Sequence, residues 1–174
     1  MAIIANSYTS STIKRLQRQT RVLLKNQSLP FSKNQNGKIG IAAVFDIQHI
    51  KYYNESEIKY SAPEGYRVVL VCAEEIFGAL DFYLKGKRLH FSSAFGGLQL
   101  DNLITALNLT ARKYAHIKVE YKVSCIEFLH ASQPYLAVFS NKKFEIWTLE
   151  NYELKKLTRK QIQSRLSKIK TGFQ

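Results

Sequence analysis

Two of the Glu-x-Lys motifs in this 174-residue chain loosely match the arrangement of residues that a magnesium-dependent endonuclease uses. The first is Glu120-Tyr121-Lys122, with Asp101 upstream of it, and the second is Glu57-Ile58-Lys59, which follows Asp46. In such enzymes carboxylates hold the metal ion, the metal ion polarises the phosphate, and a lysine lies near the attacking water. The first motif defines one hypothesis, in which Asp101, Glu120 and Lys122 are catalytic and Mg²⁺ is the cofactor.

Both motifs lie in a weak structural context for a nuclease of the restriction-like PD-(D/E)XK type, which places an acid on one strand and Glu-x-Lys on the next. Asp101 precedes a helical pattern and is expected to cap that helix. Glu57 lies in a polar stretch that is typical of a turn, and Glu-x-Lys is frequent by chance in a basic protein. The endonuclease is therefore the alternative hypothesis, and the sequence favours a protein without catalytic activity.

Other chemistries have less support. The four histidines are scattered without metal-ligand spacing, and no CxxC pair, nucleotide-binding glycine loop or nucleophile motif occurs. Cys72 and Cys125 each lie in an apolar run, so we predict buried free thiols. The sequence predicts no metal site and, outside the endonuclease hypothesis, no cofactor.

The positive charge of the chain is concentrated at its two ends. Of the formal net charge of +13, residues 1–38 contribute seven cations and residues 155–174 seven more, with no acid in either segment. The remaining stretch between them, 39–154, has twelve cations and thirteen acids. Because segregated basic charge is typical of a contact surface for a polyanion, the two ends are the candidate binding regions.

Both ends have the periodicity of amphipathic helices. In 10–26 the predicted apolar seam recurs at helical spacing and consists of Ile13, Leu16, Thr20 and Leu23. Cations lie mainly on its flanks, and Ser10 or Ser11 is the expected N-cap. In 158–171 a similar seam follows Thr158, which can cap the helix. The cations predicted to contact phosphate are Lys14, Arg15, Arg18, Arg21, Lys25, Arg159, Lys160, Arg165 and Lys168.

These patterns predict a nucleic-acid-binding protein whose cationic helices contact the phosphate backbone of DNA or RNA. The protein could act as a subunit of a nucleoprotein assembly. Binding to an anionic membrane surface by the same helices is a further alternative. It is less favoured, because their apolar seams contain no Trp and no Phe.

The body, 38–153, is predicted to alternate strands and helices. Strands are expected over 38–53, 56–61, 66–72, 87–93, 116–130 and 135–149, the last as a hairpin around Asn141 and Lys142. Helices are expected over 73–86 and 102–115. The chain is thus predicted to be a single α+β domain, 1–174, with a mixed sheet of about six or seven strands, two internal helices and a basic amphipathic helix at each terminus.

The sequence also bears on location. The first residues lack the basic-then-apolar order of a secretory signal, and no apolar run has the length of a membrane span. We therefore expect a soluble intracellular protein. The Ser/Thr-rich, basic and acid-free composition of 1–38 leaves import into an organelle open as an alternative.

Overall fold

The structure is a computed structural model that describes residues 8–26, 29–31, 37–54, 57–116, 121–127, 133–140 and 143–171. These residues contain three helices, an eight-stranded mixed sheet and a two-stranded hairpin, which confirms the predicted α+β class with one strand more than the upper expectation. The helices are α1 (Ser10–Asn26), α2 (Gly97–Tyr114) and α3 (Arg159–Thr171). The strands are β1 (Ile39–Gln48), β2 (Ile50–Asn54), β3 (Glu57–Tyr60), β4 (Gly65–Cys72), β5 (Glu75–Lys85), β6 (Arg88–Phe95), β7 (Tyr121–Ile126), β8 (Tyr135–Ser140), β9 (Lys143–Glu150) and β10 (Glu153–Lys156).

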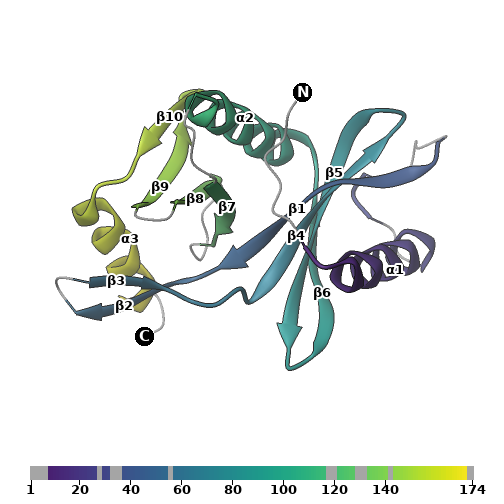
Figure 1. Cartoon of the computed structure of the whole chain (residues 1–174), viewed down its shortest axis with the longest axis horizontal. Coiled ribbons are helices and arrows are strands. Elements are labelled where there is room, and N and C mark those ends of the chain that lie inside the picture. The colour runs from purple at the N-terminus through teal and green to yellow at the C-terminus, as the bar shows by residue number, and fades with distance from the viewer. Residues whose placement is uncertain are drawn as a thin grey trace.

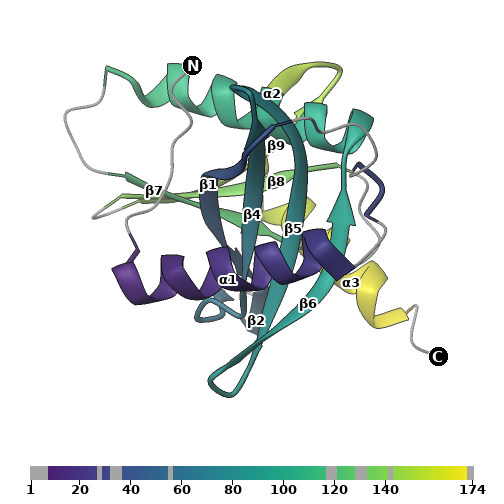
Figure 2. The same cartoon turned by 90° about the vertical axis from the view of Figure 1, so that its right-hand side faces the viewer.

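The large sheet consists of two antiparallel halves joined by one parallel pair. Its strand order is β10-β9-β8-β7-β1-β4-β5-β6, and β1 and β7 run parallel. The sheet is bent, so that β7–β9 run across the direction of β4 and β5 (Figures 1 and 2). Helix α2 contacts β5 in one half and β9 and β10 in the other. The face toward α2 is called the inner face below, and the opposite face the outer face.

The inner face carries a core to which both halves of the sheet contribute. Alternating residues of the strands point to it, among them Phe45, Val69, Val123 and Leu136, and α2 adds Leu103 and Leu107. All of these side chains are buried. Because one continuous core spans both halves, burial of apolar surface against α2 stabilises the bend.

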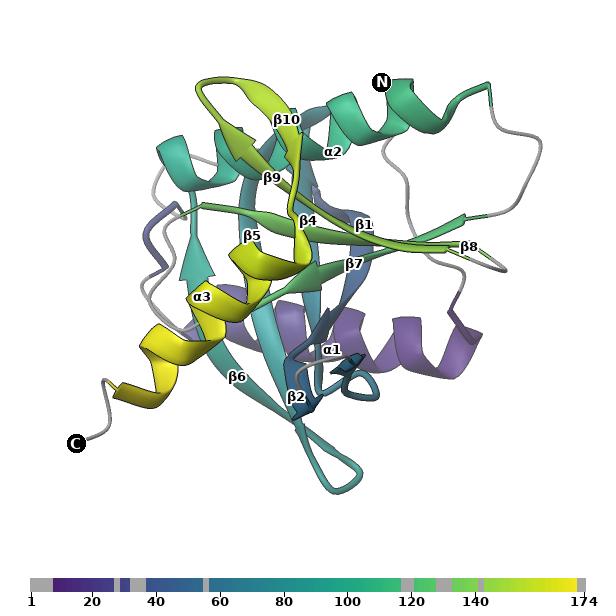
Figure 3. The same ribbon diagram turned by 90° about the vertical axis from the view of Figure 1, so that its left-hand side faces the viewer.

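The outer face carries two separate cores, one under each basic helix. Leu16 and Leu23 of α1 pack on Val44, Val68 and Leu80 of the N-terminal half. Ile162 of α3 packs with Ile126, Ala137 and Ile146 of the C-terminal half. The two basic helices therefore cover different halves of the same face (Figures 2 and 3).

The predicted helix over 73–86 is wrong, because this segment is β5. Its apolar residues fit a helical seam, but β5 is a central strand between β4 and β6, and Gly78–Phe82 is buried on both faces. A strand buried on both faces has a nearly continuous apolar run, which periodicity does not separate from a helix. The connection from β4 also lacks the usual turn signal, since Ala73 and Glu74 adopt positive φ without Gly or Asn.

Two predicted caps are also corrected. Helix α1 begins after Thr9, whose Oγ1 accepts a hydrogen bond from Thr12 N at 3.4 Å, so the cap is neither Ser10 nor Ser11. Helix α2 begins at Gly97, so Asp101 lies one turn inside the helix. The predicted cap at Thr158 is confirmed, because Thr158 and Gln161 exchange backbone-to-side-chain hydrogen bonds at the start of α3.

Candidate nucleic-acid interface

Helix α1 lies along the outer face with its apolar seam against the sheet. Leu16, Thr20 and Leu23 of the predicted seam are buried, which confirms the orientation expected from the sequence. All five predicted cations of this helix, Lys14, Arg15, Arg18, Arg21 and Lys25, are exposed. The periodicity of the seam therefore turns the positive charge toward solvent along the whole helix. Figure 2 shows α1 lying across the strands of the N-terminal half.

Four of these cations form a stripe along one side of α1. Lys14, Arg18, Arg21 and Lys25 are separated by four, three and four residues, so they recur on successive turns, about 5–6 Å apart along the axis. None of the four forms an ion pair with the part of the chain that the structure describes. Val22, which is 47% exposed, lies beside the stripe. We call Lys14, Arg18, Arg21 and Lys25 the α1 stripe.

The turn between β5 and β6 extends this positive surface. Arg15 donates a hydrogen bond from its guanidinium to the carbonyl oxygen of Lys87 at 2.6 Å, which holds the turn beside α1. Lys85, Lys87 and Arg88 are all exposed. These three residues were not among the predicted contacts, because Lys85 was assigned to the wrong helix over 73–86 and Lys87 and Arg88 to the strand predicted after it. The Lys-Gly-Lys-Arg run at 85–88 was the signal that could have identified them.

The C-terminal basic segment is partly neutralised by acids of β9. Glu150 pairs with Lys155 and with Arg165, each at 3.5 Å. Glu145 pairs with Lys156. Arg165 also donates a hydrogen bond to the Tyr135 hydroxyl and lies over the ring of that residue.

Of the other predicted contacts in this segment, Arg159 and Lys160 are exposed. Lys168 belongs to the part of α3 whose side chains are outside the described set. The predicted contacts of α1 are therefore all exposed, whereas Arg165 of α3 is held within the molecule.

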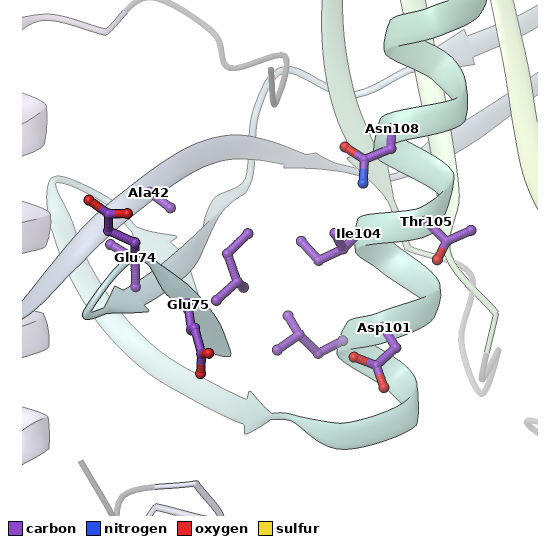
Figure 4. Close-up of a pocket in the computed structure, with 10 residues that line it drawn as sticks. Ala42, Glu74, Glu75, Asp101, Ile104, Thr105 and Asn108 are labelled. Carbon is purple, nitrogen blue, oxygen red and sulfur yellow. The ribbon is translucent and has the colours of Figure 1, made fainter. Parts of the chain in front are cut away.

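The predicted nuclease residues are not brought together by the described part of the fold. Asp101 lies on α2, on the inner side of the sheet, and lines a groove opposite Glu75 (Figure 4). Lys122 lies on the outer face, where its ammonium group pairs with Asp46. Glu120 is outside the described residues. Asp101 and Lys122 therefore belong to different surfaces.

The groove that contains Asp101 is acidic. It runs between the β4–β5 turn and α2, with Glu74 and Glu75 on the sheet side and apolar residues such as Ile76 and Ile104 beneath them. Neither Glu74, Glu75 nor Asp101 forms an ion pair within the described chain. This negative edge would repel a polyanion and leaves the outer face as the candidate interface.

A polar cluster on the inner face was also missed by the sequence analysis. Arg67 donates two hydrogen bonds of 2.8 Å to Asp81, which is 2% exposed. Burial opposes the charge of Arg67, but the Asp81 carboxylate outweighs burial and raises the pKa of Arg67. Nearby, Tyr83 donates to Glu127, and burial followed by the charge of Asp81 raises the pKa of Glu127. We interpret this cluster as an internal ionic network, because its strongest pair is fully satisfied.

His49 approaches Glu127 of this cluster and a second acid, Glu64. Its Nε2 lies 3.5 Å from Glu64 and 4.0 Å from Glu127. Even so, no group of three or more His, Cys, Asp or Glu side chains in the described residues is arranged to hold a metal ion. The predicted free thiols are confirmed, since Cys72 and Cys125 are unpaired and buried, and burial raises the pKa of Cys125 to about 11.

Comparison with other proteins provides no further assignment. No family model, curated protein or solved structure matches the chain. Among the described residues, no helix combines the length and the apolar character needed to cross a membrane.

Proposed function

We propose that this protein binds nucleic acid through the α1 stripe and the β5–β6 turn, with its contacts made to the phosphate backbone. The observation that carries the proposal is that four cations on successive turns of one helix are exposed and unpaired within the described chain. The protein could do so alone or as a subunit of a nucleoprotein assembly.

The geometry of the stripe supports a backbone contact. Its twelve residues, 14–25, extend about 16 Å along the helix axis, and a duplex carries about nine phosphates over that length of its axis. A cation is worth more to a polyanion when no internal acid competes for it, because binding then replaces only solvent and counterions. Lys85, Lys87 and Arg88 add positive charge beside the helix, where Arg15 joins the turn to α1.

The test is binding to labelled single- and double-stranded DNA and RNA over a salt series. We expect a steep loss of affinity with salt, with a log–log slope that corresponds to about four or more phosphate contacts. The variant Arg18→Gln/Arg21→Gln should reduce that slope by about two and weaken binding about tenfold or more at 0.1 M salt. The preferred strand type would identify the partner.

The matched control is Lys155→Gln/Lys156→Gln, which removes the same charge from residues that already pair with Glu150 and Glu145. It should change the affinity less than about threefold. Equal losses in the two variants would mean that net charge, and not α1, determines binding.

Two further arms address the alternatives. Incubation with Mg²⁺ followed by electrophoresis of the nucleic acid tests the endonuclease hypothesis, in which Glu120→Ala should abolish cleavage and preserve binding. If no nucleic acid binds even at low salt, the proposal fails. Flotation with anionic liposomes then tests the membrane alternative.

A further inference from the structure

A strip of polar residues separates the two apolar cores of the outer face. It lies where β1 and β7 pair in parallel, and its members are Asp46, Gln48, Tyr66, Lys122 and Ser124. The core under α1 begins on one side of it and the core under α3 on the other. We call these five residues the polar strip.

Three members of the strip are deeply buried and present oxygens that lack hydrogen bonds. Asp46, Gln48 and Ser124 are 2%, 5% and 0% exposed. Asp46 Oδ2, Gln48 Oε1 and Ser124 Oγ accept no hydrogen bond from the described residues. An unsatisfied buried polar group costs about 1–3 kcal/mol. Asp46 Oδ2 has only its ion pair with Lys122, and Gln48 Oε1 and Ser124 Oγ have no partner among the described residues, so this grouping requires a physical reason.

The register of the sheet brings these three side chains to one region of the outer face. Asp46 and Ser124 are direct partners across the β1–β7 pair, with Cα atoms about 4.8 Å apart, and their side chains leave the same face. Gln48 is two residues beyond Asp46 and points to that face as well. Carboxylate, amide and hydroxyl side chains on such closely spaced residues can bind a single ion, whose oxygen ligands lie about 2.0–2.6 Å from it.

The chemistry of the three groups favours a cation. The carboxylate and the amide oxygen only accept hydrogen bonds, and a serine hydroxyl also has lone pairs to offer. Gln48 donates its Nε2 to the Ser61 carbonyl oxygen at 3.1 Å, which leaves Oε1 as its remaining group. Neutral and anionic oxygens of this kind are the ligands that Mg²⁺, Mn²⁺ and Ca²⁺ prefer in proteins.

Lys122 already brings positive charge to this position. Its ammonium group forms an ion pair with Asp46 Oδ2, although the contact lacks the directionality of a hydrogen bond. The Lys122 side chain is 49% exposed, so it can swing into solvent. It satisfies the charge of Asp46 and leaves Gln48 Oε1 and Ser124 Oγ without a donor.

We propose that Asp46, Gln48 and Ser124 form a binding site for a hard divalent cation of the Mg²⁺ or Mn²⁺ type, which displaces the Lys122 ammonium group. Two of the three ligands are neutral, which distinguishes the site from a cluster of acidic and histidine ligands. The proposal does not depend on nucleic-acid binding. A cation held there would add to the positive charge of the outer face beside Tyr66, whose ring contacts Tyr8 just before α1.

The experiment is calorimetric titration of the full chain with Mn²⁺ at constant ionic strength. We expect one site per chain, and Asp46→Asn should weaken it by about 100-fold or more because the only anionic ligand is lost. Gln48→Leu and Ser124→Ala should each weaken it by about tenfold. The control is Asp101→Asn, which removes one carboxylate from the acidic groove and should leave Mn²⁺ binding unchanged.

The variant Lys122→Met provides a second test, which applies even if Asp46→Asn fails to fold. Without its competing ammonium group, the site should bind Mn²⁺ about fivefold more tightly, and Mn²⁺ should raise the melting temperature of this variant more than that of the natural chain. The proposal is overturned if millimolar Mn²⁺ does not bind, if Asp46→Asn leaves binding intact, or if Lys122→Met melts lower without responding to Mn²⁺. Any of these results would mean that the strip holds ordered water only.

Discussion

The two basic ends of this chain look alike in sequence and differ in the fold. Both are amphipathic helices that cover the outer face of one sheet, and both come from segments without acids. Helix α1 keeps its stripe exposed, whereas Glu145 and Glu150 of β9 pair with Lys156, Lys155 and Arg165 at the C-terminal end. The two ends carry equal numbers of cations in the sequence, but they do not leave equal positive charge for a binding partner. The acids on the strands beside each helix determine how many of its cations are neutralised.

The difference has a topological origin. Helix α1 packs on β1, β4 and β5, and the charged pair of that half, Arg67 with Asp81, points to the inner face. Helix α3 follows directly on β10, which pairs with β9, so the cations of the C-terminal segment emerge beside Glu145 and Glu150. Because α3 follows a strand that pairs with β9, the glutamates of β9 neutralise part of the positive charge of the C-terminal segment.

The largest effect should come from undocking α1. Leu16→Ala removes a fully buried side chain under the helix and should lower the free energy of unfolding by about 2–5 kcal/mol. Leu166→Ala, at a half-buried position on α3, should cost about 1 kcal/mol. Urea denaturation measures both, and exposed Val22→Ala, expected to stay within about 0.5 kcal/mol, is the control. If both variants lost the same free energy of unfolding, the deeper burial of Leu16 under α1 would not make it the more stabilising contact.

A second, smaller effect should be a pH-dependent contribution to stability that comes from the C-terminal half alone. Burial opposes the charge of Glu145, but hydrogen bonds from Lys156 and Tyr114 outweigh burial and lower its pKa below the usual 4.5. Because the folded pKa is lowered, the ionised Glu145 stabilises the fold above pH 4.5, and this contribution disappears as the pH falls through the lowered value. The natural chain should therefore be about 1 kcal/mol more stable than Glu145→Gln at pH 7.

That difference should shrink as the pH falls below 4.5 and through the lowered pKa, and thermal unfolding of the two proteins across this range measures it. Helix α1 contains no acidic residue, so the effect of Leu16→Ala should not change in the same way. A gap between the natural chain and Glu145→Gln that stays constant down to the pH of acid unfolding would exclude the ion pair as the stabilising contact.

The smallest effect concerns the charge that β9 neutralises. Glu150→Gln releases Lys155 and Arg165, and we expect nucleic-acid affinity to rise by about twofold to threefold, with a salt slope that changes by less than about one. The gain in affinity is small because the released cations, Lys155 and Arg165, lie on the C-terminal half of the sheet, whereas α1 lies on the N-terminal half. Binding over the same salt series measures it. A slope that rises by two or more would show that the C-terminal segment belongs to the interface.

Much of the arrangement of the two basic helices could be predicted from the sequence. Spacing alone placed Leu16, Thr20 and Leu23 toward the body and the five cations of α1 toward solvent, because a helix with one apolar stripe must bury that stripe. The β8–β9 hairpin and the Thr158 cap also followed from local chemistry. Local rules failed at β5, where burial on both faces removed the alternation that identifies a strand.

The sequence by itself determined the α+β class, the two basic helices and which side of each faces the body, since these depend on periodicity and composition within short segments. Only the tertiary structure decided that Arg165 is held by Glu150, that Lys87 lies beside Arg15, and that Asp46 faces Ser124 across a parallel pair. Each of these contacts joins residues far apart in the chain. They depend on the order of strands in the sheet, which no local pattern encodes.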